Sequence, residues 1–462
     1  MLHERTAAAI ESLYADRLDD HLAELAHQYR RGGNLEKAIE YLTRAGEQTA
    51  AKGADNGAIA QLGTALELIS ELPDDQGNRV QEIRLRILIG PSLMAVKGQG
   101  ASEIGANYTR ALELCQLAGD TSALFEALSG LWVFHLLRAE LRDAEALAER
   151  LLTSVGESKD DTRLAYANFA AGDTAFWCGR IETASERLAL AIDACKPGTP
   201  PSRVFVDDPA MISRAYAAWT QHYRGYPDQA LRTVLDCVQV AHVLAHPRAL
   251  AMATIYAGQL HLLRREPDAA IERCRTSTAL AAEHGLAFYL AFAQILMGCA
   301  AVQRGEGARG VDTIKQGFDA WRALGSVLGG PWFLGEFAAG LSSIGHCDEA
   351  LDVVSDALRQ AEESGERQFT AELHRIAGVA RLTQGNLVAA ESSLLRAIEI
   401  ARMQSARMWE LRATTSFARL LDQQGRRDEA RARLGKIYGW FTEGFDIADL
   451  KDAKALLESK LS

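Results

Sequence analysis

Small residues recur every 40 positions along most of this 462-residue chain, and this repeat constrains the fold more than any other feature. Segments of the form G-x-x-x-x-A mark the repeat, and the residue at the alanine position is its anchor. The anchors are Ala38, Ile104, Ala144, Ala184, Ala230, Ala270, Gly310, Ala350, Ala390 and Ala430. Successive spacings are 66, 40, 40 and 46, followed by 40 five times. Such a period predicts a stack of similar units rather than one central core.

Two further columns keep the same register. Five residues before the anchor, glycine occupies seven of ten positions, which suits a turn between helices because glycine reaches a positive φ without penalty. Twelve residues before the anchor the side chain is small in every repeat except at Trp132, so two helices can cross closely there. Alanine and leucine also favour helix. The sequence therefore predicts an all-α, right-handed superhelical solenoid of tetratricopeptide-like (TPR-like) hairpins with a period of about 40 residues.

Two interruptions of the period divide the chain. The interval of 66 has room for one extra helix, which we predict at Asp55–Leu72. The step of 46 includes Lys196–Pro209, where four of the ten prolines predict a loop. We expect four segments: an N-terminal hairpin plus extra helix at 1–75, repeats at 76–195, a Pro-rich loop insertion at 196–209, and repeats with a C-terminal capping segment at 210–462.

Composition excludes several classes of function. A net charge of −11 argues against a general phosphate-binding surface, so we expect no nucleic acid partner. No apolar run approaches the ~20 residues that cross a bilayer, and the N-terminus lacks an apolar signal segment, so we expect no membrane contact. Seven scattered cysteines without a CxxC pair are typical of reduced thiols. Together these features predict a cytoplasmic protein.

Candidate catalytic motifs all have structural explanations. The segment GEGARG at Gly305–Gly310 matches a dinucleotide fingerprint, but that motif works only after a β-strand, and here a helix is expected before it. A phosphate-binding loop of the Walker type is absent from the sequence. His242 and His246 have the i, i+4 spacing of zinc ligands, but no third ligand is near and Pro247 follows. We therefore predict no catalytic residues, no cofactor and no metal.

The remaining candidate site is the concave face of the solenoid. The register predicts that residues 18, 15, 11, 8 and 7 positions before each anchor point inward. Around Ala184 and Ala230 this gives a candidate groove of Tyr166, Phe169, Phe176, Trp177, Trp219, His222 and Tyr223. Later repeats place polar residues in these columns, such as Glu372 and Arg375. Two interpretations stay open: the aromatic residues line a ligand groove, or they pack between the helices.

Several sequence segments, spread over most of the chain, resemble one protein family. LHERTAAAIESLYADRLDDHLAELAHQYRRGGNLEKAIEYLTRAGEQTA at Leu2–Ala50 looks like the junction between an ATPase module and its repeats, and YGWFTEGFDIADLKDAKALLE at Tyr438–Glu458 is similar to the family's ending. AWTQHYRGYPDQAL, LAHPRALAMA, LHLLRREPDAAIERC, IKQGFDAWRALGS and ERQFTAELHRIAG follow in the family's order. The family comprises bacterial signalling proteins that join a class III adenylate/guanylate cyclase domain to an AAA-type (STAND-like) ATPase and a TPR tail. The cyclase and ATPase modules are absent from this sequence.

The resemblance implies a role in signal transduction, because the TPR tail of such proteins is thought to act as sensor and scaffold. We expect a non-catalytic scaffold for protein–protein interaction, the regulatory or sensor tail of a cyclase/ATPase system, with an ATPase or cyclase module among its partners. The alternative is a sensor that binds a small-molecule inducer in the aromatic groove. No enzymatic activity of the family can be carried onto a residue of this chain.

Overall fold

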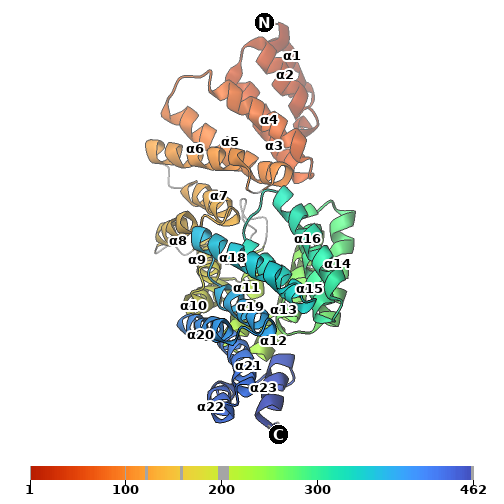
Figure 1. Cartoon of the computed structure of the whole chain (residues 1–462). Helices are drawn as coiled ribbons and strands as arrows, with labels where there is room; N and C mark the ends of the chain where they lie inside the picture. The colour runs from red at the N-terminus through yellow and green to blue at the C-terminus, as the bar shows by residue number, and fades with distance from the viewer. Residues whose placement is uncertain (1, 99, 120–122, 157–159, 196–207, 459–462) are drawn as a thin grey trace. The chain divides into compact units, whose positions relative to one another are not determined.

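The computed structural model describes residues 2–98, 100–119, 123–156, 160–195 and 208–458, and all regular structure in these ranges is helical. The chain divides into two compact units. Unit 1 is formed mainly by residues 1–137 and unit 2 mainly by residues 138–462. This confirms the predicted all-α fold class, and Figure 1 shows the helices packed as successive pairs.

Unit 1 contains seven α-helices and one short 3₁₀ helix among its described residues. They are α1 (Leu2–Leu13), η1 (Leu18–Asp20), α2 (Leu22–Gly32), α3 (Leu35–Ala51), α4 (Asp55–Ile69), α5 (Gln76–Lys97), α6 (Ser102–Ala118) and α7 (Leu124–Leu137). Helix α4 is the extra helix that the interval of 66 residues predicted. A continuous apolar core joins α1 to α5, with Leu25, Ile39, Leu62 and Leu85 completely buried.

The described residues of unit 2 form the remaining sixteen helices. They are α8 (Leu141–Val155), α9 (Asp161–Trp177), α10 (Ile181–Ala194), α11 (Pro209–Arg224), α12 (Pro227–Leu244), α13 (Pro247–Leu263), α14 (Pro267–Glu283), α15 (Ala287–Gln303), α16 (Gly307–Ala323), α17 (Gly330–Ser343), α18 (Cys347–Ser364), α19 (Thr370–Thr383), α20 (Leu387–Met403), α21 (Arg407–Gln423), α22 (Arg427–Tyr438) and α23 (Ala448–Glu458). The predicted Pro-rich loop at 196–209 lies outside the described residues except for its last two positions.

The repeat register is confirmed at every anchor. All ten anchor residues are buried, and so are all ten residues twelve positions earlier. The closest crossing joins α15 to α16, where a Cβ on Gly298 would lie 2.9 Å from the carbonyl oxygen of Gly310. Turn residues five positions before the anchor have positive φ wherever they are described, including Ala139 (φ 54°) and Arg265 (φ 59°), which take the place of glycine. The small-residue columns therefore mark real helix contacts.

The superhelix of unit 2 closes on itself, which brings residues 184 to 215 positions apart into contact. The backbone N–H of Arg367 donates to the carbonyl oxygen of Trp177 at 2.7 Å. At the C-terminal end, Arg265 bonds to Asp449, while Glu443 accepts hydrogen bonds from the start of α12. In Figure 1, α23 lies beside α21. The inner face of the repeats is therefore covered by later repeats instead of facing a wide groove.

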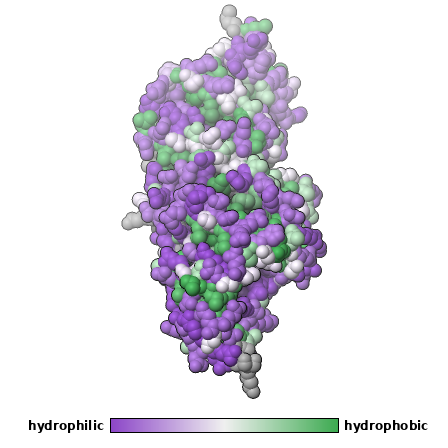
Figure 2. All heavy atoms as spheres, viewed as in Figure 1, coloured by the Kyte–Doolittle hydropathy of each residue, from purple (hydrophilic) through white to green (hydrophobic). Residues whose placement is uncertain are grey.

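The visible surface is mostly hydrophilic, with small hydrophobic patches (Figure 2). Among the described helices, none is both long enough and apolar enough to span a lipid bilayer.

Candidate functional site at the inner face of unit 2

The seven aromatic and histidine residues predicted to face inward are all buried. Their exposed fractions lie between 0% for Tyr166 and His222 and 8% for Trp177. Phe176 is at the centre, with ring centroids 5.4–6.1 Å from those of Trp177, Trp219 and Tyr223. In this conformation the side chains pack between helices, which is the second of the two interpretations. A direct ligand role for them stays a prediction.

Phe176, Trp219 and Tyr223 belong to a closed circuit of aromatic contacts, which the sequence did not reveal. Neighbouring ring centroids lie 4.8–6.4 Å apart, in the order Trp219, Tyr256, Phe292, Trp332, Phe369, Trp409, Tyr223, Phe176 and back to Trp219. Edge-to-face and tilted contacts at such distances are favourable beyond the area they bury. The circuit joins residues of successive repeats from α9 to α21.

A polar cavity of about 210 Å³ lies next to this aromatic circuit. We call it the inner chamber. Its lining comes from the turn between α13 and α14, from α19, from α21 and from α23, and comprises Arg265, Arg375, Arg412, Thr415, Ser416, Arg419, Asp449 and Asp452. Arg419 keeps 52% of its side chain exposed and Asp452 keeps 39%, so the chamber can be reached from solvent.

Ion pairs connect the charged residues of the inner chamber. Arg375 donates to both carboxylate oxygens of Glu372, at 2.7 and 2.8 Å, and Arg412 lies 2.7 Å from the same carboxylate. Arg265 bonds to Asp449 at 3.2 Å and to Asp452 at 2.7 Å. Bidentate guanidinium–carboxylate contacts fix the relative orientation of the two groups in addition to pairing their charges. The chamber is therefore a preorganised set of mixed charges.

Burial and neighbouring charges shift the pKa values around this network. Burial alone would raise the pKa of Glu372, but Arg375 and Arg412 hold it below its ordinary value. Glu336 is raised to a pKa of about 7 by burial and by Glu372, against the pull of Arg412. Burial, with Arg264 and Arg412, lowers the pKa of His222 to about 3, so that imidazole is neutral at physiological pH.

Some residues at the inner chamber could be predicted from the repeat register. Glu372 and Arg375 stand 18 and 15 residues before Ala390, as the inward columns predicted. Arg412, Thr415 and Arg419 stand 18, 15 and 11 residues before Ala430, so the same columns could have identified them. Arg265 lies at a turn position, and Asp449 and Asp452 lie in the C-terminal segment. Only the closure of the superhelix brings these three to the site.

The candidate motifs outside the chamber have structural explanations. Gly305 is the left-handed turn residue between α15 and α16, and Gly310 is the anchor of its repeat, so GEGARG follows a helix as expected. Helix α12 ends at Leu244, which places His242 and His246 on opposite sides of a turn. The two histidines therefore do not share a helical face.

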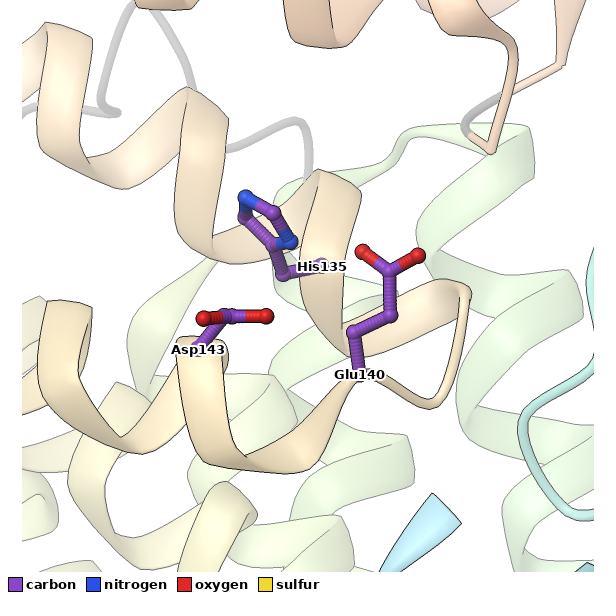
Figure 3. A group of neighbouring side chains, drawn as sticks. All are labelled: His135, Glu140 and Asp143. Atoms are coloured by element: carbon purple, nitrogen blue, oxygen red, sulfur yellow. The ribbon is translucent and has the colours of Figure 1, made fainter. Parts of the chain in front are cut away.

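Three side chains at the turn after α7 have metal-ligating atoms within 4.8 Å of one another. Figure 3 shows them as His135, Glu140 and Asp143. All three are engaged in interactions within the protein. Acidic groups near a surface commonly cluster without a metal, so we assign no metal to this group.

Comparison with known proteins identifies the fold class. No family model matches the chain. A curated protein of Rhizobium meliloti (strain 1021), described as uncharacterized, is 23% identical over 406 residues, which cover 86% of this chain and 39% of the relative. The chain thus spans about two fifths of the length of that relative.

Among solved structures, a Rap protein complexed with competence and sporulation factor superimposes with a TM-score of 0.58 at 12% identity, covering 79% of this chain and 98% of the Rap chain. Aspartyl phosphate phosphatase F from Bacillus subtilis gives a TM-score of 0.46 at 12% identity, with 80% and 95% covered. Yeast Tom70 gives 0.36 at 14%, with 96% of each chain covered. The Rap likeness, together with the confirmed register, shows that the chain has a TPR-like helical-repeat fold.

Proposed function

We propose that this chain is a non-catalytic helical-repeat module that binds a protein partner through the mouth of its inner chamber. The observation that carries this proposal is a solvent-accessible set of preorganised charges at the point where the turn between α13 and α14 meets the last helices of unit 2. Fixed charges of both signs favour the correct partner and reject others. The Rap protein of similar fold was solved with a bound factor, which supports the same use of a repeat surface.

A charge-matched pair of variants tests this proposal. Arg419→Gln removes one exposed cation from the chamber, whereas Arg232→Gln removes an exposed cation from the outer helix α12. Proteins captured by the full chain would be quantified by mass spectrometry, after circular dichroism has confirmed equal folding. We expect a partner that the wild type and Arg232→Gln retain and Arg419→Gln loses. Equal capture by all three proteins would contradict the proposal.

We infer further that the partner belongs to a signalling system containing an ATPase or cyclase module. The support is the resemblance of most of the chain to such tails, and the greater length of the curated relative, of which this chain spans 39%. The test is a binding titration between this chain and a purified ATPase module of such a protein, with Arg419→Gln as the control. Failure of the wild-type chain to bind would reject this partner class while leaving the chamber proposal open.

The non-catalytic part of the proposal gives a prediction of its own. Arg375 and Arg412 pair with Glu372 and hold its pKa below the ordinary value, which suits binding rather than proton transfer. We expect purified protein to show neither ATP hydrolysis nor cyclic nucleotide formation above background. Turnover that persists through repeated purification, and that falls in a chamber variant, would contradict this expectation.

A further inference from the structure

One buried acceptor in the inner chamber lacks a hydrogen-bond partner. Asp449 has a side chain only 5% exposed, and while its Oδ1 accepts from Arg265, its Oδ2 is buried without a donor. Leaving a buried charged acceptor unsatisfied costs free energy, so such atoms in folded proteins usually meet water or a ligand. Asp449 lines the inner chamber, so its carboxylate marks a place for an N–H or O–H donor.

Two guanidinium groups of the chamber have nitrogen atoms without a close carboxylate partner, although Nη2 of Arg412 lies 2.7 Å from Glu372. The Nη2 atom of Arg419 lies 3.7 Å from Asp452, and the Nε atom of Arg412 lies 3.9 Å from Oδ1 of Asp449. Both distances exceed that of a hydrogen bond. The four arginines of the chamber face the carboxylates of Glu372, Asp449 and Asp452. Glu336, near Arg412, has a pKa of about 7 and is only partly ionised at neutral pH, so the set keeps a partial excess of positive charge. An incoming carboxylate would complete this set.

We propose that the inner chamber binds a small zwitterionic ligand of the α-amino-acid type, with its carboxylate on Arg412 and Arg419 and its ammonium group donating to Asp449. The Nε donor of Arg412 and the carboxylate of Asp449 lie beside each other, with 3.9 Å between Nε and Oδ1. An α-amino acid likewise carries its anionic and cationic groups on one carbon. A bare phosphate or dicarboxylate would satisfy the arginines but would leave Oδ2 of Asp449 without a donor. A cavity of about 210 Å³ has room for such a molecule.

This inference goes beyond the proposed protein partner and also suggests how a ligand acts. Arg265 comes from the turn before α14, Arg412 and Arg419 from α21, and Asp449 from α23. A ligand held among them tightens the contact between the α13–α14 turn and the last helices of unit 2. A molecule that binds only the closed, folded state stabilises that state by mass action.

The experiment measures thermal unfolding of the full chain with each of the twenty standard L-amino acids at millimolar concentration. Positive results are followed by calorimetric titration. Succinate and inorganic phosphate serve as anions without an ammonium group, and ethanolamine as a cation without a carboxylate. We expect at least one amino acid to raise the melting temperature, and none of the three control compounds to match it.

Variants locate the site. Asp449→Asn and Arg419→Gln should each weaken binding of that amino acid at least tenfold, while Arg232→Gln leaves it unchanged. Arg419 is half exposed, so its variant keeps the test valid if Asp449→Asn does not fold. The proposal is overturned if no amino acid binds, if succinate or phosphate binds as well as the amino acid, or if Arg419→Gln binds like the wild type. Partner capture is measured separately, so either proposal can fail alone.

Discussion

Trp219 illustrates how much a single buried side chain contributes to the stability of unit 2. Its ring is 2% exposed, its Nε1–H donates to the carbonyl oxygen of Tyr256 at 3.2 Å, and its neighbours include Phe176. Trp219→Ala would leave a cavity and remove this hydrogen bond, so we expect a loss of about 3–5 kcal/mol in the free energy of unfolding. Urea denaturation measures it. Val388→Ala, at a side chain 83% exposed, should change stability by less than about 0.5 kcal/mol. A small effect of Trp219→Ala would favour the ligand-groove interpretation instead.

Glu366 makes stability depend on pH. Burial raises the pKa of its carboxyl to about 8, although the backbone N–H of Gly329 donates to it and opposes the shift. In the unfolded chain the same group has a pKa near ~4.3. Between these values the folded state holds a proton that the unfolded state has released. The contribution of the Glu366 carboxyl to the free energy of unfolding is therefore complete below about pH 4.3. It is lost as pH rises toward 8, by roughly 1.4 kcal/mol per pH unit.

Glu366→Gln removes this titration while keeping an oxygen that can accept from Gly329. We expect the variant to gain stability relative to wild type as pH rises from 5 to 8, and the two profiles to run parallel above about pH 8. Denaturation at several pH values gives the difference directly, because groups such as Glu336 contribute equally to both proteins. A constant difference across this range would show that Glu366 titrates normally.

The start of α12 shows how one element completes another from far away in the sequence. Its N-cap residue, Tyr226, supplies no side-chain acceptor. Glu443 supplies one instead, because its Oε1 accepts from the backbone N–H groups of Asp228 and Gln229, both at 3.0 Å. In return, Gly444 donates to the carboxylate of Asp228 at 2.9 Å. Two elements 215 residues apart thereby stabilise each other, and the C-terminal segment is fastened to α12.

Removing the acceptor should loosen this contact. We expect Glu443→Ala to cost about 0.5–2 kcal/mol, the usual range for a lost helix cap, and to speed amide hydrogen exchange in the first turn of α12. Glu443→Gln keeps a neutral acceptor and should show a smaller effect. Hydrogen exchange with mass spectrometry resolves this turn from the rest of the chain. Unchanged exchange at Asp228 and Gln229 in Glu443→Ala would contradict the role of this cap.

Helices and their pairing could be predicted from the sequence wherever residues close together in the chain determine them. Small residues such as Gly298 and Gly310 must occupy crossing points because no side chain fits there, so the helix pairs could be predicted. The extra helix α4 followed from the interval it fills. The cap from Glu443 could not be predicted, because nothing near Tyr226 or near Glu443 in the sequence indicates that they meet.

Closure of the superhelix is the main property of unit 2 as a whole. It depends on small rotations between neighbouring repeats that add up over some 190 residues, and no single residue encodes their sum. The sequence therefore predicted which residues point inward, including Glu372 and Arg375, but it did not predict that later repeats cover the aromatic ones. For the same reason the contribution of α23 to the inner chamber, from Asp449 and Asp452, was missed.

Closure also changes what a deletion should do. In an open solenoid, removing one whole repeat leaves the remaining contacts intact. Here, deletion of residues 271–310 would separate pairs such as Tyr223–Trp409 and Arg265–Asp449. We expect the shortened protein to keep helical circular dichroism while losing near-ultraviolet tryptophan signal and melting at a much lower temperature. A shortened protein with wild-type melting and near-ultraviolet spectra would show that closure contributes little.

The closed aromatic circuit also limits how such a protein can change in length over evolution. Open repeat arrays lengthen readily when a segment of the gene is duplicated, because a new copy only has to fit its two neighbours. In unit 2 a duplicated repeat would also shift Trp409 away from Tyr223 and α23 away from Arg265. Duplications of repeats within unit 2 would therefore be selected against, whereas additions before α8 or after α23 would leave the aromatic circuit intact.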